Sequence, residues 1–146
     1  MDDLVRSSHK VFRLKYHFVF CLKYRKDIFV DEKYINSLKE ICKGIEERHH
    51  LKFETIGFDG DHVHFMVQSL TTTYSPARIF QIVKSISAIK MFGFHKEIKE
   101  SLWGGEFWSD GGFVSTVGEC VNAEIIRRYI SNQGRNKEQL KLYDFI

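Results

Sequence analysis

The chain has 146 residues, of which 43% are hydrophobic and 14% aromatic, and its formal net charge at pH 7 is +3. This apolar content excludes a disordered chain, and the length suits one globular domain with a buried core. The small net charge does not by itself diagnose a nucleic-acid partner. We expect a single domain over residues 1–146, with a core from about residue 11 to 134 and a C-terminal tail over 135–146.

The cysteine content and the first residues indicate a cytosolic protein. Cys21, Cys42 and Cys120 are odd in number and lack metal-type spacing, so reduced, packed thiols are expected. Asp2 and Asp3 are not followed by the apolar core of a signal peptide. No segment approaches the roughly 20 apolar residues that span a bilayer.

Basic residues are concentrated near the N-terminus. Such a stripe could contact phosphates, or it could be a solvated sheet edge protected by lysines, and the sequence leaves both interpretations open. The basic residues of this segment are Arg6, Lys10, Arg13, Lys15, Lys23, Arg25 and Lys26.

The first half of the chain predicts a strand, a helix and a second strand. Residues 11–23 alternate between apolar and polar, which is typical of a half-buried strand. Asp31 can cap a helix with apolar residues at helical spacing, which His49 and His50 close. Residues 51–58 predict a strand with poor alternation, and Asp59-Gly60-Asp61 predicts a tight turn. The strand that follows should therefore form an antiparallel hairpin.

The strand after this turn contains two histidines, His62 and His64. Alternate side chains of a strand point to opposite faces, so Val63 and Phe65 share an apolar face and the histidines share the other. Two imidazoles at this spacing could bind one metal ion. Two solvated polar residues on an open face are the plainer interpretation of the pair alone.

The second half predicts a helix, a short strand and a last helix. Ser75 caps a helix with Pro76 at its first position. An aromatic, glycine-broken segment follows at 102–108, and Phe113 with Val114 looks strand-like. A capping-box pattern from Thr116 opens the last helix, which ends near residue 134.

This order of elements matches the ferredoxin-like βαββαβ plan of the α+β class. We therefore expect an antiparallel sheet with two helices on one face, plus a C-terminal helix that carries Tyr129. The two histidines would lie on the open face of the sheet. Tyr129 and Gln133 are four residues apart and share one face of the last helix, where plain packing of Tyr129 is the simpler interpretation.

Four segments together resemble a known family. They are residues 16–25, Asp61-His62-Val63-His64, the tryptophan-glycine-glycine segment at 102–108, and Arg128-Tyr129-Ile130 with Gln133. In order and separation they resemble the single-tyrosine HUH transposases (TnpA-type, IS200-like) of small insertion sequences. Gly60 and Gly112 depart from the family pattern, in which proline and an aromatic residue are common at these positions.

The resemblance implies a metal-dependent enzyme that cleaves single-stranded DNA at hairpin-bearing element ends. It assigns the metal to His62, His64 and Gln133, and it makes Tyr129 the nucleophile that forms a covalent 5′-phosphotyrosine. It also implies strand transfer, a homodimer whose sites are shared between subunits, and a cytoplasmic, nucleoid-associated protein.

The chemistry explains these residue types. A divalent cation stabilises charge on the phosphate oxygens, and two imidazoles with an amide bind it without adding negative charge. Imidazole favours manganese over magnesium, yet either Mg²⁺ or Mn²⁺ is compatible with the sequence. A tyrosine hydroxyl, whose ordinary pKa is about 10, is a weak nucleophile at neutral pH unless a neighbouring cation favours the phenolate.

Several basic residues are candidate DNA contacts, with a solvated surface as the alternative for each. Lys15, Lys23 and Arg25 belong to the N-terminal stripe. His17 lies on the face opposite Phe18, toward the histidine pair, and a structural role is the simpler expectation. The remaining candidates are Lys84, Arg127 and Arg128.

Three other functions stay open at this point. One is a non-catalytic module that binds hairpin nucleic acid. Another is a domesticated relative that cleaves palindromes without moving an element. A zinc hydrolase that uses water would leave Tyr129 without a role.

Overall fold

A computed structural model describes residues 3–102 and 105–118. The chain divides into two compact units, Met1–Thr116 and Val117–Ile146, and the fold below is that of the first. Thr116, the first residue of the predicted capping box, ends a strand. The rest of the predicted last helix, from residue 119 on, lies outside the described residues, as do Cys120, Arg127, Arg128, Tyr129 and Gln133. A single domain over all 146 residues stays a prediction.

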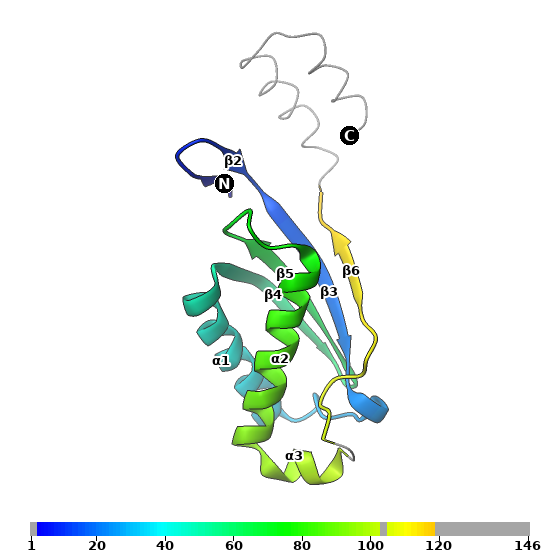
Figure 1. Ribbon diagram of the computed structural model, residues 1–146. Coiled ribbons are helices and arrows are strands. Elements are labelled where there is room, and N and C mark those ends of the chain that lie inside the picture. Colours follow the sequence, from blue (N-terminus) through cyan, green and yellow to red (C-terminus); the bar gives the residue numbers. More distant parts are fainter. Residues whose placement is uncertain (1–2, 103–104, 119–146) are drawn as a thin grey trace. The chain divides into compact units, whose positions relative to one another are not determined.

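The first unit contains a four-stranded antiparallel sheet in the order β4-β5-β3-β6. Its strands are β3 (Leu14–Cys21), β4 (Leu51–Asp59), β5 (His62–Ser69) and β6 (Phe113–Thr116). The helices α1 (Glu32–His49) and α2 (Pro76–Phe94) cover one face of this sheet (Figure 1). This confirms the predicted α+β class and the ferredoxin-like βαββαβ arrangement.

Both long helices begin where their capping residues predict, and α1 also ends at the predicted histidines. The Asp31 side chain accepts a hydrogen bond from the backbone N–H of Lys33, and the Ser75 side chain accepts one from Arg78. His50 ends α1 in the left-handed conformation, with φ of 52°. Side-chain caps satisfy backbone donors that a helix leaves unpaired, which fixes the start of each helix.

The β4–β5 hairpin forms as predicted, and its register explains the poor alternation of the first of its strands. The pairing of β4 with β5 shifts between Phe53 and Thr55. A bulge places an extra residue in one strand and interrupts the period of two. The two cysteines in the described residues, Cys21 and Cys42, are free thiols, as expected.

Three short elements were not predicted. The strand β1 (Val5–Arg6) pairs with β2 (Val11–Phe12) in a small hairpin, so the predicted strand over 11–23 is divided into β2 and β3. At the C-terminal end of that predicted strand, the chain forms the 3₁₀ turn η1 (Lys23–Arg25). The helix α3 (Lys96–Ser101) has six residues and no side-chain cap, so it lacks the signals on which a sequence-based prediction depends.

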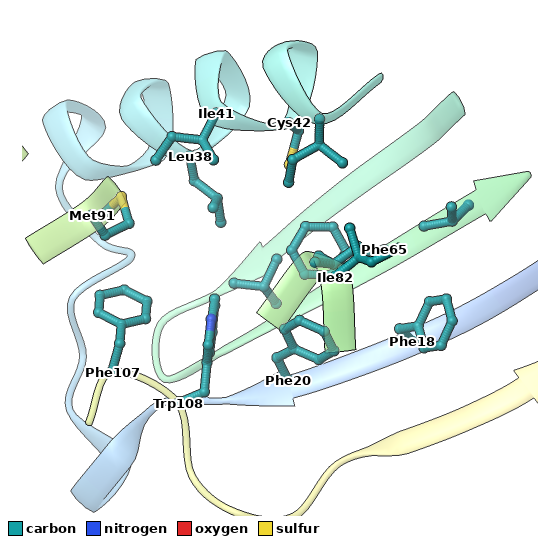
Figure 2. Packing of buried hydrophobic residues seen from close by; sticks show 14 of the residues in the cluster. Phe18, Phe20, Leu38, Ile41, Cys42, Phe65, Ile82, Met91, Phe107 and Trp108 are labelled. Atoms are coloured by element: carbon teal, nitrogen blue, oxygen red, sulfur yellow. The ribbon is translucent and has the colours of Figure 1, made fainter. Parts of the chain in front are cut away.

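The core lies between the sheet and its two helices. Figure 2 shows Leu38 and Ile41 of α1 and Phe65 of β5 pointing into this layer, with Phe107 and Trp108 at one end. All of these side chains are buried. Within the described ranges, no helix is long and apolar enough to cross a membrane.

Trp108 packs in the core of the first unit. Its ring meets Phe20 edge-on, with the centroids 5.2 Å apart. Its indole N–H donates a 2.9 Å hydrogen bond to the Ser87 hydroxyl, which in turn donates to the Val83 carbonyl oxygen. This interaction attaches the loop after α3 to the buried side of α2.

Gly112 is closely packed against an aromatic ring. A Cβ atom at this position would lie 2.4 Å from Cζ of Phe80 and 3.2 Å from the Val19 carbonyl oxygen. Phe80 in turn packs on Phe18 and Phe20. In this chain the Phe80 ring therefore occupies the space that a side chain at 112 would need.

The Ser87–Trp108 hydrogen bond yields a stability prediction. Ser87→Ala removes the acceptor of a buried N–H, so the free energy of unfolding should fall by about 1–3 kcal/mol. Urea unfolding followed by tryptophan fluorescence measures the change. Ser85→Ala is the matched control, because Ser85 lies in the same helix and only accepts from exposed Gln81. Equal losses in the two variants would contradict the assignment.

Candidate functional site

The alternation of β5 places the two predicted metal-binding histidines on the open face of the sheet. Val63, Phe65 and Val67 are fully buried, whereas His62 and His64 are half-buried. Burial of the first set against the helices forces the second set to the opposite face. The predicted arrangement of this strand is confirmed.

The neighbouring strands surround His64 unequally. On β3 its partner is Val19, and on β4 its partner is Gly57. A Cβ atom on Gly57 would lie 3.7 Å from Cβ of His64, an ordinary contact distance. Because glycine has no side chain, the sheet surface beside His64 stays open on the β4 side.

His62 is held by a carboxylate that is itself held by an arginine. Nδ1 of His62 lies 2.8 Å from Oδ1 of Asp61, and Oδ2 of Asp61 accepts a 2.8 Å hydrogen bond from Nε of Arg25. These hydrogen bonds, His62 first and Arg25 second, hold the pKa of Asp61 below its usual value. Asp61 is therefore a carboxylate at neutral pH. Nε2 of His62 lies 3.2 Å from Oδ2 of Asp59.

His64 is held by a third histidine. Its Nδ1 lies 3.1 Å from Nε2 of His17, and the two rings are nearly parallel and meet edge to edge, with their centroids 5.3 Å apart. Burial, followed by the neighbouring His62 and His17, lowers the pKa of His64. The ring is therefore neutral at neutral pH, which is the form that binds metals. The sequence placed His17 on this face but gave no sign of the contact.

The two imidazoles fit a divalent metal ion. In each ring Nδ1 is engaged by a neighbour, as is usual for metal-binding histidines, so Nε2 is the nitrogen that would bind a metal. Nε2 of His62 contacts the exposed Asp59 carboxylate, which a metal ion would have to displace from this nitrogen. Over the described ranges, no three His, Cys, Asp or Glu side chains are grouped so as to hold a metal by themselves. The predicted third ligand, Gln133, lies outside these ranges.

The four candidate DNA contacts that the structure describes all have partners within the chain. Lys15 contacts Asp3 at 2.5 Å and Glu54 at 2.8 Å, and these carboxylates raise its pKa. Lys23 contacts Glu106 at 3.0 Å. Arg25 contacts Asp61, as described above, although its side chain is 67% exposed. Lys84 donates to the Asp110 carbonyl oxygen at 3.4 Å and lies over the Phe80 ring. Binding of DNA by these residues stays a prediction.

Gly60 allows the tight turn that precedes β5. Its φ is +63°, a left-handed conformation that proline cannot adopt, and an added Cβ would lie 2.7 Å from Oδ1 of Asp27. Its carbonyl oxygen also accepts a hydrogen bond from Phe29. This turn therefore requires glycine at position 60 of this chain.

Comparisons with known proteins agree on one family. The sequence pattern of the family described as "Transposase IS200 like" matches residues 10–133. The chain is 34% identical to the ISDra2 transposase TnpA of Deinococcus radiodurans, over 90% of this chain and 91% of that protein. It is 27% identical to the transposase for insertion sequence element IS200 of Salmonella typhimurium, over 91% of this chain and 85% of that protein.

Solved structures agree with the sequence relatives. A crystal structure of a Deinococcus radiodurans R1 protein assigned as a transposase matches with a TM-score of 0.70 and 30% identity, covering 88% of this chain and 96% of that one. A REP-associated tyrosine transposase bound to a REP hairpin matches with a TM-score of 0.53 and 9% identity, covering 87% and 72%. The second similarity concerns the fold alone.

The ion pairs of Asp3 yield a pH prediction. Asp3 pairs with Lys15 and with Arg13, and these two cations, Lys15 first, lower the pKa of Asp3 from 3.8 to about 2. The contribution of these pairs to stability should therefore be complete above pH 3.8 and be lost as the pH falls toward 2. Wild type should therefore exceed Asp3→Asn in free energy of unfolding by up to about 1 kcal/mol near pH 6. Urea unfolding between pH 2 and 6 measures the difference. A gap that persists at pH 2 would contradict this cause.

Proposed function

The chain belongs to the family of IS200-like transposases, and from this membership we propose that it cleaves and rejoins single-stranded DNA through Tyr129 in a metal-dependent reaction. The family supports a role in DNA transposition. The histidine pair on the open face is the observation that supports the finer chemistry. Tyr129 and Gln133 enter the proposal from the sequence, because they lie outside the described residues.

His62 and His64 would hold the metal through Nε2, with Gln133 as the third ligand. Nδ1 of His62 contacts Asp61, and Nδ1 of His64 contacts His17. A bound Mg²⁺ or Mn²⁺ would neutralise negative charge that develops on the phosphate oxygens during cleavage. Because imidazole and amide ligands are neutral, they would leave the positive charge of the metal ion undiminished.

Tyr129 would form the covalent intermediate. Its phenol loses a proton, its oxygen forms a bond to phosphorus, and the bond from phosphorus to the 3′-oxygen breaks. The products are a 5′-phosphotyrosine and a free 3′-hydroxyl. Because the phosphoester bond is conserved, a second 3′-hydroxyl can attack the phosphotyrosine and join the strands without ATP.

The proposed substrate is single-stranded DNA with hairpin ends. One structural neighbour is a transposase bound to a REP hairpin, and we extend hairpin binding to this chain on the shared fold. Lys15, Lys23 and Lys84, together with Arg25, Arg127 and Arg128, are the proposed DNA contacts. We further propose a homodimer in which each Tyr129 serves the histidine pair of its partner.

The proposed nucleophile yields a direct prediction. Tyr129→Phe should still bind a labelled hairpin oligonucleotide but should form no covalent adduct, because phenylalanine lacks the attacking oxygen. A denaturing gel after incubation with Mn²⁺ detects the adduct. Tyr143→Phe is the matched control and should form the adduct like wild type. Persistence of the adduct in Tyr129→Phe would end the assignment.

The proposed metal ligands yield another prediction. His62→Ala and His64→Ala should each weaken Mn²⁺ binding by more than about 100-fold, because loss of a ligand costs more than the 10–100-fold that outer partners cost. Calorimetric titration measures the affinity, and chelation should abolish cleavage by wild type. The exposed His9 is the control position, where alanine should change nothing. Tight hairpin binding without any cleavage in Mn²⁺ would instead favour a non-catalytic binding module.

A further inference from the structure

We propose that His17 is the positioning residue of His64: its Nε2 accepts a hydrogen bond from Nδ1–H of His64, and this directs Nε2 of His64 to the metal. The inference rests on the proposed function only in making His64 a metal ligand. The hydrogen bond between the two rings is a property of the metal-free chain.

The sheet itself brings the two rings together. In the pairing of β3 with β5, Val19 lies opposite His64 and His17 lies opposite Met66, so the two histidines are diagonal neighbours on one face. Long side chains can meet across such a diagonal. The two rings lie edge to edge at an interplanar angle of 17°, and the two nitrogens lie 3.1 Å apart, so an N–H of one ring can point at the nitrogen of the other.

The position of His17 is fixed from its other side. The Phe113 ring of β6 meets the His17 ring edge-on, with the centroids 6.2 Å apart and an interplanar angle of 74°. His17 is thus held between Phe113 and His64.

Only one proton arrangement makes His64 a competent ligand. If Nε2 of His17 donated the proton, His64 would be left with Nδ1 as acceptor and a protonated Nε2, which has no lone pair for a metal. If His64 donates through Nδ1, its Nε2 is free to bind. Nε2 of His17 is then occupied by the hydrogen bond, so this nitrogen does not bind the same ion.

The two ligand histidines would therefore differ in their support. Nδ1 of His62 meets the carboxylate of Asp61, whereas Nδ1 of His64 meets a neutral imidazole. A carboxylate acceptor makes its imidazole a stronger ligand, and a neutral acceptor orients the ring without adding negative charge. The site would thus combine one ligand supported by an anion with one supported by a neutral ring.

Three variants of the full chain test the proposal. His17→Phe keeps an aromatic ring but removes the acceptor. His17→Gln restores an acceptor oxygen near the position of Nε2, and His17→Asn provides the same amide with too short a reach. Phe113→Leu is the control that removes the ring contact to His17 and leaves the hydrogen bond.

Two measurements read the result. In ¹⁵N NMR spectra of the metal-free protein, His64 should carry its proton on Nδ1 in wild type, in His17→Gln and in Phe113→Leu, and should shift toward Nε2–H in His17→Phe and His17→Asn. Titration with Mn²⁺ should show binding about 10–100-fold weaker in the Phe and Asn variants, and within a few-fold of wild type in the Gln variant.

The outcomes that overturn the proposal are distinct from those that overturn the proposed function. Unchanged His64 protonation and unchanged Mn²⁺ affinity in His17→Phe and His17→Asn would refute the positioning role. Should the Phe variant fail to fold, the Gln and Asn pair decides in its place, and equal behaviour of these two refutes the role. If His62→Ala and His64→Ala bind Mn²⁺ as wild type does, the metal site itself is wrong, while the NMR measurement still reports on His17.

Discussion

The side-chain alternation of β5 is the constraint on which the proposed site depends. Val63, Phe65 and Val67 have no exposed surface, and burying each such side chain is worth about 1.5–3 kcal/mol. A slip of one residue in register would expose this set and bury both histidines. The hydrophobic core thus specifies where the imidazoles point, and the hairpin turn at Gly60 determines where the strand starts.

Orientation of the imidazoles within that face comes from a second layer of contacts. Arg25 holds Asp61, Asp61 holds His62, and His17 holds His64. None of these three partners belongs to the core, and each comes from a strand, a turn or a short helical turn beside β5. The sheet determines the face on which each histidine lies, and these three neighbouring side chains determine the orientation of each imidazole ring.

Much of the fold could be predicted from the sequence because its signals are local. Asp31 and Ser75-Pro76 mark helix starts, and alternation marks β3 and β5. The bulge near Phe53 weakened the alternation of β4, which was still predicted, whereas α3 was too short and uncapped to predict. The His62–His64 pair followed from spacing, but the contact of His17 with His64 depends on the pairing of distant strands, which no local pattern reveals. Likewise, the sequence showed lysines and arginines but not their carboxylate partners.

Those carboxylate partners change what the basic residues offer a nucleic acid. Lys15 and Lys23 are already engaged by Asp3, Glu54 and Glu106. A DNA phosphate reaching either lysine would have to displace an internal acid, so contact becomes an exchange of one anion for another. Affinity from such exchanges is small, and a strand that fits the surface poorly would gain little from charge alone. Lysines that are already paired with carboxylates would thus weaken non-specific binding to chromosomal DNA. The shape of the bound DNA, and not its charge, would then decide which DNA binds.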